Sequence, residues 1–182
     1  VHGANFSFIV SEDGGAQCGR RNSLLAEHET FFSFQRVRDR YKDKIWAMFQ
    51  KLKADKLKEA SMSSNASNVP TLKKIIVYGE LFGAVYPSPL VEDLGFVHIQ
   101  KGVYYYNDIE FYAFDIYLIF DTEEESADNN KKQMQQQQKL VEQDSMFKNK
   151  FEDYDKCVAL FEEFQIFYAK PLLIRSEERR VG

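Results

Sequence analysis

The amino-acid sequence predicts an α+β domain of antiparallel sheets with flanking helices. Residues 29–60 carry apolar side chains at three- and four-residue steps, which is typical of a long amphipathic helix. The runs 5–10, 72–78 and 109–120 are rich in Phe, Ile, Val and Tyr, which is typical of strands. Hydrophobic residues make up 44% of the 182 residues, so one domain with a true core is expected.

A hairpin is expected at the start of the chain. Residues 5–10 form its first strand, residues 11–15 supply turn residues, and residues 16–21 return as the second strand. The hairpin ends in Arg20 and Arg21. A guanidinium is a planar fork of donors that suits ribose or phosphate oxygens, but it can equally end a strand in solvent.

The helix predicted over residues 29–60 has one apolar stripe and many basic residues. The stripe consists of Phe34, Val37, Tyr41, Ile45, Met48, Phe49 and Leu52. The basic residues on the other faces are Arg36, Arg38, Arg40, Lys42, Lys44, Lys51, Lys53, Lys56 and Lys58. They form either an RNA-binding surface or, as the interspersed acidic residues favour, an ordinary solvated helix face.

A Ser- and Asn-rich loop over residues 61–69 leads to a buried strand over 72–78. This strand is expected to deliver Gly79 and Glu80 to its end. A carboxylate there can accept hydrogen bonds from ribose hydroxyls or help to hold a metal-bound water. A long loop is expected over residues 84–100, and loops of this length in compact domains are often functional.

Aromatic strands are expected over residues 103–106 and 109–120. Phe114 is a candidate for stacking on a nucleobase, because a flat apolar ring gains free energy by offset stacking on a base. Asp115 is expected to support the site from the same strand end. The neighbouring aromatic residues are expected to belong to the core, and these are Phe111, Tyr112 and Tyr117.

The last third of the chain begins with a polar, Gln-rich insert at residues 121–143, whose composition cannot bury a core. An amphipathic helix is expected over 152–164 and a closing strand over 166–173. Residues 175–182 are interpreted as a non-native tail, so the partial domain extends over residues 1–174.

Composition narrows the function classes. The net charge of −4 argues weakly against a protein that binds nucleic acid through a broad basic surface. The two cysteines, Cys18 and Cys157, stand far apart, which indicates a reducing compartment, and no Cys/His cluster suggests zinc. No apolar run is long enough to span a bilayer. We therefore expect an intracellular protein, cytoplasmic or mitochondrial, without a membrane partner.

Three short blocks carry the candidate chemistry. The first is His2-Gly3-Ala4-Asn5-Phe6, where glycine permits close approach of a ligand, and His and Asn offer donors and acceptors. The second is Tyr78-Gly79-Glu80-Leu81-Phe82-Gly83, and the third is Phe111-Tyr112-Ala113-Phe114-Asp115-Ile116. Each block is short, and their order and spacing together carry the signal.

In this order the blocks resemble those of covalent nucleotidyltransferases, and most closely the RNA ligase 2 family, which includes the kinetoplastid RNA-editing ligases. The family's first motif reads Lys-x-His-Gly-x-Asn-Phe, so its nucleophilic lysine would immediately precede Val1. Tyr86-Pro87 and residues 100–105 also resemble the editing-ligase branch. The resemblance covers residues 1–173 and implies an ATP-grasp-like ligase adenylation domain. That domain is incomplete here, because two later motifs would follow Leu173.

The resemblance implies an ATP-dependent RNA ligase that seals 3′-hydroxyl and 5′-phosphate ends of nicked or bridged RNA. The reaction would pass through lysyl-AMP and RNA-adenylate, with Mg²⁺ and ATP as cofactors. The implied catalytic residues are His2 and Glu80, and the implied nucleotide-binding residues are Gly3, Asn5, Arg21, Glu80 and Phe114. Arg20 is the reserve for Arg21, Asp115 is a supporting residue, and no metal ligand is assigned. Without the lysine, the piece is expected to be inactive by itself.

Two alternatives remain open. A DNA ligase or capping-type nucleotidyltransferase would share the implied fold, but those families place Asp-Gly after the lysine, and His2-Gly3 with Asn5 favours an RNA ligase. The other alternative is a non-catalytic nucleotide- or RNA-binding relative, in which the residue before Val1 would not be lysine.

Overall fold

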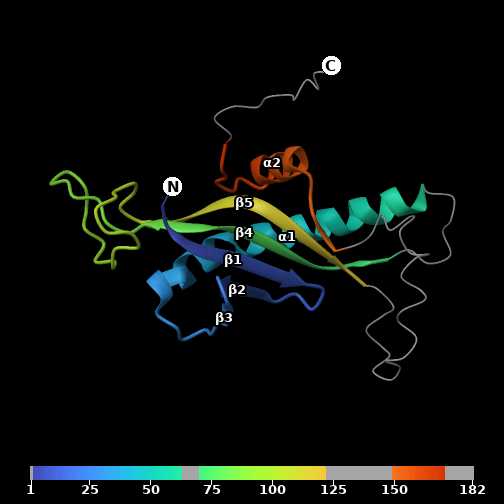
Figure 1. The fold of residues 1–182 in the computed structure, drawn as a ribbon, viewed down its shortest axis with the longest axis horizontal. Coiled ribbons are helices and arrows are strands. Elements are labelled where there is room, and N and C mark those ends of the chain that lie inside the picture. The colour runs from blue at the N-terminus through green and yellow to red at the C-terminus, as the bar shows by residue number, and fades with distance from the viewer. Residues whose placement is uncertain (1, 63–69, 122–148, 171–182) are drawn as a thin grey trace, which may run out of the picture.

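A computed structural model describes residues 2–62, 70–121 and 149–170, and these form one antiparallel sheet with helices on one side (Figure 1). The sheet has six strands in the order β3-β2-β1-β4-β5-β6. The strands are β1 (Ala4–Ser11), β2 (Ala16–Arg20), β3 (Ser23–Leu25), β4 (Leu72–Gly83), β5 (Ile109–Phe120) and β6 (Lys150–Phe151). The helices are the short 3₁₀ helix η1 (Phe31–Ser33), α1 (Phe34–Ser61) and α2 (Tyr154–Glu163). The predicted α+β class is therefore confirmed at this level.

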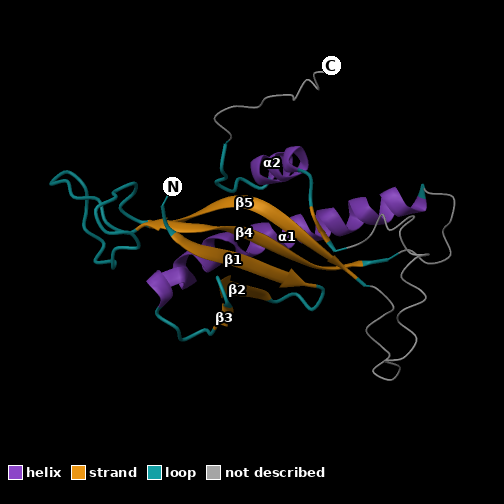
Figure 2. Cartoon of the chain, viewed as in Figure 1, coloured by secondary structure: helices purple, strands orange, loops and turns teal. Residues whose placement is uncertain are grey.

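Helix α1 covers the back of the sheet in Figure 2, and its buried residues include the predicted apolar stripe. Every residue of that stripe is buried. Tyr41 packs edge-on against Phe8 of β1 at 6.3 Å between ring centroids, and Phe34 lies 6.1 Å from Phe6. The 3.6-residue period of the sequence thus correctly identified the side of the helix that meets the sheet.

Helix α1 begins later than the predicted start at residue 29. Phe32 and Ser33 adopt positive φ values of 45° and 51°, so the backbone bends just before Phe34. The Gln35 side chain donates hydrogen bonds to the carbonyl oxygens of Glu27 and Glu29 and holds the preceding turn in place. Such a boundary depends on local backbone geometry, which the hydrophobic period does not report.

The basic residues of α1 mostly contact carboxylates. The ion pairs include Arg38 with Glu27, Arg36 and Arg40 with Asp108, Lys53 with Glu12, and Lys56 with Glu152. These contacts favour the interpretation of an ordinary charged helix over that of a bare RNA-binding face. No helix among the described residues is both long and apolar enough to cross a membrane.

Helix α2 lies beside β5 and packs into the same core as α1 (Figure 1). Its buried residues are Cys157, Leu160 and Phe161, which confirms the amphipathic helix predicted there. Burial raises the pKa of the Cys157 thiol to about 11, so this cysteine is an inert core residue. The strand predicted over 166–173 is reduced, in its described part, to one bridge between Tyr168 and Ala113.

Two other strand predictions need correction. Residues 103–106 form part of a loop instead of a strand, because their backbone does not pair with any strand of the described sheet. Strand β4 continues through Gly79 to Gly83, so Glu80 lies within the strand and not at its end. Most of the predicted loop at 61–69, the insert beyond Asp121 and the tail at 175–182 lie outside the described residues.

The two faces of the sheet differ. The face toward α1 is mostly apolar, with Phe6, Phe8, Val77, Leu81 and Phe111 all inaccessible to solvent. No described helix covers the other face, which is turned toward the viewer in Figure 2 and is called the open face below. Phe111 is a core residue as predicted. The same prediction was wrong for Tyr112 and Tyr117, which lie half-buried on the open face.

Candidate active site on the open face

The open face brings two of the predicted site residues together. The register of β1 and β4 sets Asn5 directly opposite Glu80, and the register of β4 and β5 sets Glu80 opposite Tyr112. Side chains at directly opposed positions of antiparallel strands begin about 4.5–5.5 Å apart at their Cβ atoms. An amide, a carboxylate and a phenol therefore form one polar row across three strands.

The two candidate arginines have different surroundings. Arg20 lies opposite Phe6 and hence on the helix side. Its Nε donates to Oγ of Ser23 at 2.8 Å, an outer nitrogen lies 3.4 Å from the Glu29 carboxylate, and the guanidinium sits 5.9 Å from the Phe31 ring centroid. Arg20 thus ties the chain after the hairpin to the start of the helical region.

Arg21 follows the last paired residue of β2. The β1–β2 register, extended by one step, sets Arg21 opposite Asn5 and in line with the polar row. Arg21 is exposed. The geometry therefore favours Arg21 over Arg20 as the arginine that can reach a ligand on the open face.

A β-bulge lies next to this row. Tyr78 pairs with Asp115 and Gly79 pairs with Ala113, so Phe114 is an extra residue in β5. Bulges occur often beside active sites, where they redirect a side chain out of the regular alternation. Phe114 is half-buried, and its ring makes no ring–ring contact within the described segments. The bulge thus sets Phe114 and Asp115 in succession opposite Tyr78.

The Asp115 carboxyl lies in a less polar setting than an exposed aspartate. Burial raises its pKa above the ordinary value, and no lysine or arginine of the described segments pairs with it. A negative charge at this position lacks compensation from the described residues. A bound cation or hydrogen-bond donor would supply that compensation.

The residues before β1 border the same row. His2 is exposed, and its backbone nitrogen donates to Oη of Tyr105 at 3.2 Å. A Cβ added to Gly3 would lie 2.0 Å from the carbonyl oxygen of Leu81. The glycine is therefore required for the close approach of β1 to β4, whether or not a ligand also approaches it.

The sequence interpretation missed the aromatic border of this site. Phe82 contacts Tyr105 and Tyr112 edge-on, with ring centroids 6.2 Å and 6.0 Å apart. Strict alternation along residues 109–112 would have set Tyr112 on the face opposite the core residue Phe111. No local pattern signals Tyr105, because its position depends on the path of a long loop.

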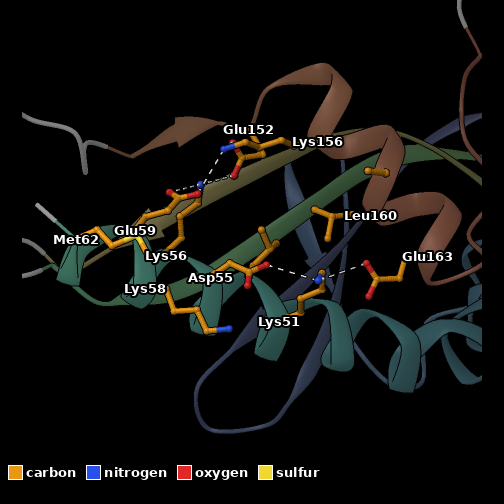
Figure 3. A pocket seen from close by; sticks show the side chains of 12 residues that line it. Lys51, Asp55, Lys56, Lys58, Glu59, Met62, Glu152, Lys156, Leu160 and Glu163 are labelled. Carbon is orange, nitrogen blue, oxygen red and sulfur yellow. Dashed lines mark hydrogen bonds and ion pairs between the residues drawn. The ribbon is translucent and has the colours of Figure 1, made fainter.

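A cavity of about 510 Å³ lies elsewhere, between α1 and α2 on the helix side of the sheet (Figure 3). Lys56 and Glu152 line it with side chains 7% and 1% exposed, and Nζ lies 2.8 Å from Oε2. That oxygen receives no well-directed hydrogen bond, so the contact is chiefly electrostatic. Lys51 pairs with Glu163 across the same cavity at 3.5 Å. Since its charges mostly satisfy one another, we do not place the chemistry there.

Neither region contains a preformed metal cage. Among the described residues, no group of three or more His, Cys, Asp or Glu side chains could hold a metal ion. The open face does offer two carboxylates in adjacent rows, Glu80 and Asp115. A Mg²⁺ ion commonly takes only one or two protein carboxylates and completes its shell with water and phosphate oxygens.

Comparison with known proteins adds one finding. A model of the RNA ligase family matches residues 1–180. No curated protein matches the chain. The family match spans every described strand and both long helices, so the open-face row lies within the matched region.

Proposed function

We propose, because the chain belongs to the RNA ligase family, that its open face binds ATP and carries out adenylyl transfer to seal RNA ends. The observation that carries this proposal is the polar row formed by Asn5 and Glu80, with Arg21 in line and Phe114 redirected beside it. These residues come from three strands and a hairpin end. Their convergence on the face that the helices leave uncovered supports a ligand site.

The chemistry of each side chain suits one part of the nucleotide. The flat ring of Phe114 would stack on the π face of the adenine base. Glu80 can accept hydrogen bonds from ribose hydroxyls, and Arg21 can donate to ribose or phosphate oxygens. Asn5 offers both a donor and an acceptor one strand away from Glu80.

The proposed reaction has three displacements at phosphorus. The family's lysine, in the position before Val1, would attack the α-phosphorus of ATP, form a P–N bond and release pyrophosphate. The RNA 5′-phosphate oxygen would then attack the same phosphorus and release the lysine. Finally the RNA 3′-hydroxyl would attack the 5′-phosphate phosphorus, form the new phosphodiester and release AMP. His2 lies beside the lysine position and can hold a phosphate oxygen or move a proton.

Magnesium fits the open face better than the rest of the described structure. Burial raises the pKa of Asp115, which has no basic partner among the described residues, so a cation nearby would favour its ionised form. Bound Mg²⁺ would neutralise phosphate charge during transfer. Glu80 and Asp115 are the residues that would hold it, directly or through water.

The finer details of the proposal follow the family resemblance. They comprise an ATP-grasp-like adenylation fold over residues 1–174, an editing-ligase-like branch and an intracellular location, cytoplasmic or mitochondrial. A six-stranded antiparallel sheet with helices on one face and an open face that carries Asn5 and Glu80 (Figure 2) supports the fold assignment.

Adenylylation of the full-length protein tests the proposal. The protein, with lysine before Val1, is incubated with ATP labelled at the α-phosphate and Mg²⁺, then denatured. We expect label on the protein, and its loss when that lysine is changed to Ala. A folded protein that carries the lysine and takes up no label would contradict the ligase function and indicate a binding protein.

A further inference from the structure

A loop that we call the tyrosine arm, residues 84–108, extends past the ends of β4 and β5 (Figure 1). Its base is closed by a hydrogen bond from the Ala84 nitrogen to the Asp108 carbonyl oxygen at 3.0 Å. Gly83 has a φ of 92°, and an added Cβ would lie 2.1 Å from that same oxygen. The chain therefore leaves β4 and enters β5 at points that lie in close contact.

The base of the arm is also tied to helix α1. The Asp108 carboxylate lies 2.8 Å from Nε of Arg36 and 2.8 Å from an outer nitrogen of Arg40. Asp108 is only 8% exposed, and hydrogen bonds from both arginines lower its pKa although burial opposes the shift. Partly buried, doubly paired carboxylates hold their geometry better than exposed pairs do. The arm thus stands on a fixed base.

The last residues of the arm, just before its base at Asp108, border the candidate active site. Tyr105 accepts a hydrogen bond from the His2 nitrogen and packs edge-on against Phe82. Tyr104 packs against His98 at 6.0 Å. Tyr104, Tyr105 and Tyr106 are 44%, 42% and 45% exposed. Tyr105 therefore lies beside the start of β1, where the polar row begins, and the half-exposed rings of Tyr104 and Tyr106 flank it in the chain.

We propose that Tyr104 and Tyr106 stack on unpaired bases of the RNA end that the open face acts on, with Tyr105 holding the arm against β1. This inference rests on the proposed function and names where a single-stranded stretch of the substrate lies. Aromatic side chains bind single strands of any sequence, because every base has a π face. Paired bases are already stacked within their helix and are much less accessible to such rings.

The charged residues of the arm do not favour RNA binding, whereas its exposed tyrosine rings can stack on bases. The arm contains one lysine, Lys101. Its acidic residues are Glu92, Asp93 and, at the base, Asp108. Binding that depends on phosphate neutralisation weakens steeply with salt, in proportion to the number of phosphates contacted. We expect the contribution of the arm to RNA affinity to change little with salt concentration.

Fluorescence anisotropy of a labelled, 5′-phosphorylated single-stranded RNA tests the proposal on the full chain. Three variants are compared with the wild type. Tyr104→Ala/Tyr106→Ala removes both rings, Tyr104→Phe/Tyr106→Phe keeps the rings without the hydroxyls, and Leu90→Ala removes another exposed apolar side chain of the same arm. Circular dichroism confirms that each variant is folded.

We expect the double alanine variant to raise the Kd for RNA by roughly 5- to 150-fold per ring lost, which is the usual range for base stacking. The double Phe variant and Leu90→Ala should bind RNA as the wild type does. Equal RNA affinity of the wild type and the alanine variant would overturn the proposal, as would a wild type that binds no single-stranded RNA.

Two further outcomes separate this inference from the proposed function. If the full-length protein takes up AMP label but the alanine variant keeps its RNA affinity, the arm proposal fails and the ligase function stands. If no label is taken up but the alanine variant loses RNA affinity, the arm is an RNA site on a non-ligase protein. Loss of affinity only in the Leu90→Ala variant would indicate an apolar protein-docking arm and would overturn base stacking.

Discussion

Asn5 of β1 stands directly opposite Glu80 of β4 on the open face of the sheet. The pairing joins the first and second candidate motifs of the sequence at one point. It follows from the antiparallel register, which also sets Phe6 opposite Gly79 on the helix-covered face. Five predictions test this site and the packing of the domain.

Glu80→Gln should weaken ATP binding by roughly 10- to 150-fold. A hydrogen bond to a charged group contributes about 1.5–3 kcal/mol, and the amide keeps the shape but loses the charge. Isothermal titration with ATP and Mg²⁺ measures the change. Glu12→Gln is the matched control, since Glu12 pairs with Lys73 at the turn end of β1. Equal losses of ATP affinity in both variants would show that Glu80 makes no direct contact with the nucleotide.

Phe114→Ala should reduce ATP affinity by roughly 5- to 150-fold, because one base–aromatic stack contributes about 1–3 kcal/mol. Phe114→Tyr should bind nearly as well as the wild type, since the ring remains. Phe167→Ala serves as control, because Phe167 is 59% exposed and lies on the segment after α2. Unchanged affinity of Phe114→Ala for ATP would exclude stacking on this ring.

Gly79→Ala should destabilise the fold by about 1–3 kcal/mol, the usual cost of overpacking a core. An added Cβ would lie 2.4 Å from the Phe111 ring and 2.5 Å from the Tyr112 carbonyl oxygen. Urea unfolding measures the loss. Gly15→Ala is the control, because nothing lies within 4 Å of its added Cβ. An unfolding midpoint of Gly79→Ala equal to that of the wild type would contradict this prediction. It would mean that β5 can move to make room for the added Cβ.

Glu152→Gln should lower the free energy of unfolding at neutral pH by about 1–3 kcal/mol, because the buried Lys56 ammonium then keeps only the half-exposed Glu59 carboxylate as counter-charge. Glu163→Gln should cost about 1 kcal/mol or less, since its pair with Lys51 is exposed. Urea unfolding of both variants gives the comparison. Similar small losses would show that the buried pair does not depend on charge.

The same pair sets a pH dependence of stability. Burial acts to raise the pKa of Glu152, but the close Lys56 ammonium and a hydrogen bond from the Asp153 backbone nitrogen together outweigh it and hold the pKa below its ordinary value. A carboxyl with a lowered folded pKa stabilises the fold above its unfolded pKa, and that stabilisation is lost as pH falls through the folded value. Wild type should therefore lose stability in acid more steeply than Glu152→Gln. Parallel profiles would contradict this assignment.

Much of the fold could be predicted from the sequence because its signals are local. The apolar stripe of α1 repeats every three to four residues, and the predicted strand over 109–120 coincides with β5. The order of the short motifs likewise pointed to the RNA ligase family, which the family match confirms. Helical period, strand propensity and motif order are all properties of neighbouring residues.

Tertiary structure alone decided the rest. The bulge at Phe114 shifts the alternation of β5, so Asp115 and Tyr117 share a face with Tyr112. Arg21 is distinguished from Arg20 only by the register of β1 against β2. Tyr105 reaches His2 only through the path of a long loop. The sequence by itself determined which residue types and motifs are present. Non-local pairing decided which of them meet, because strand register and loop path depend on contacts between segments far apart in the chain.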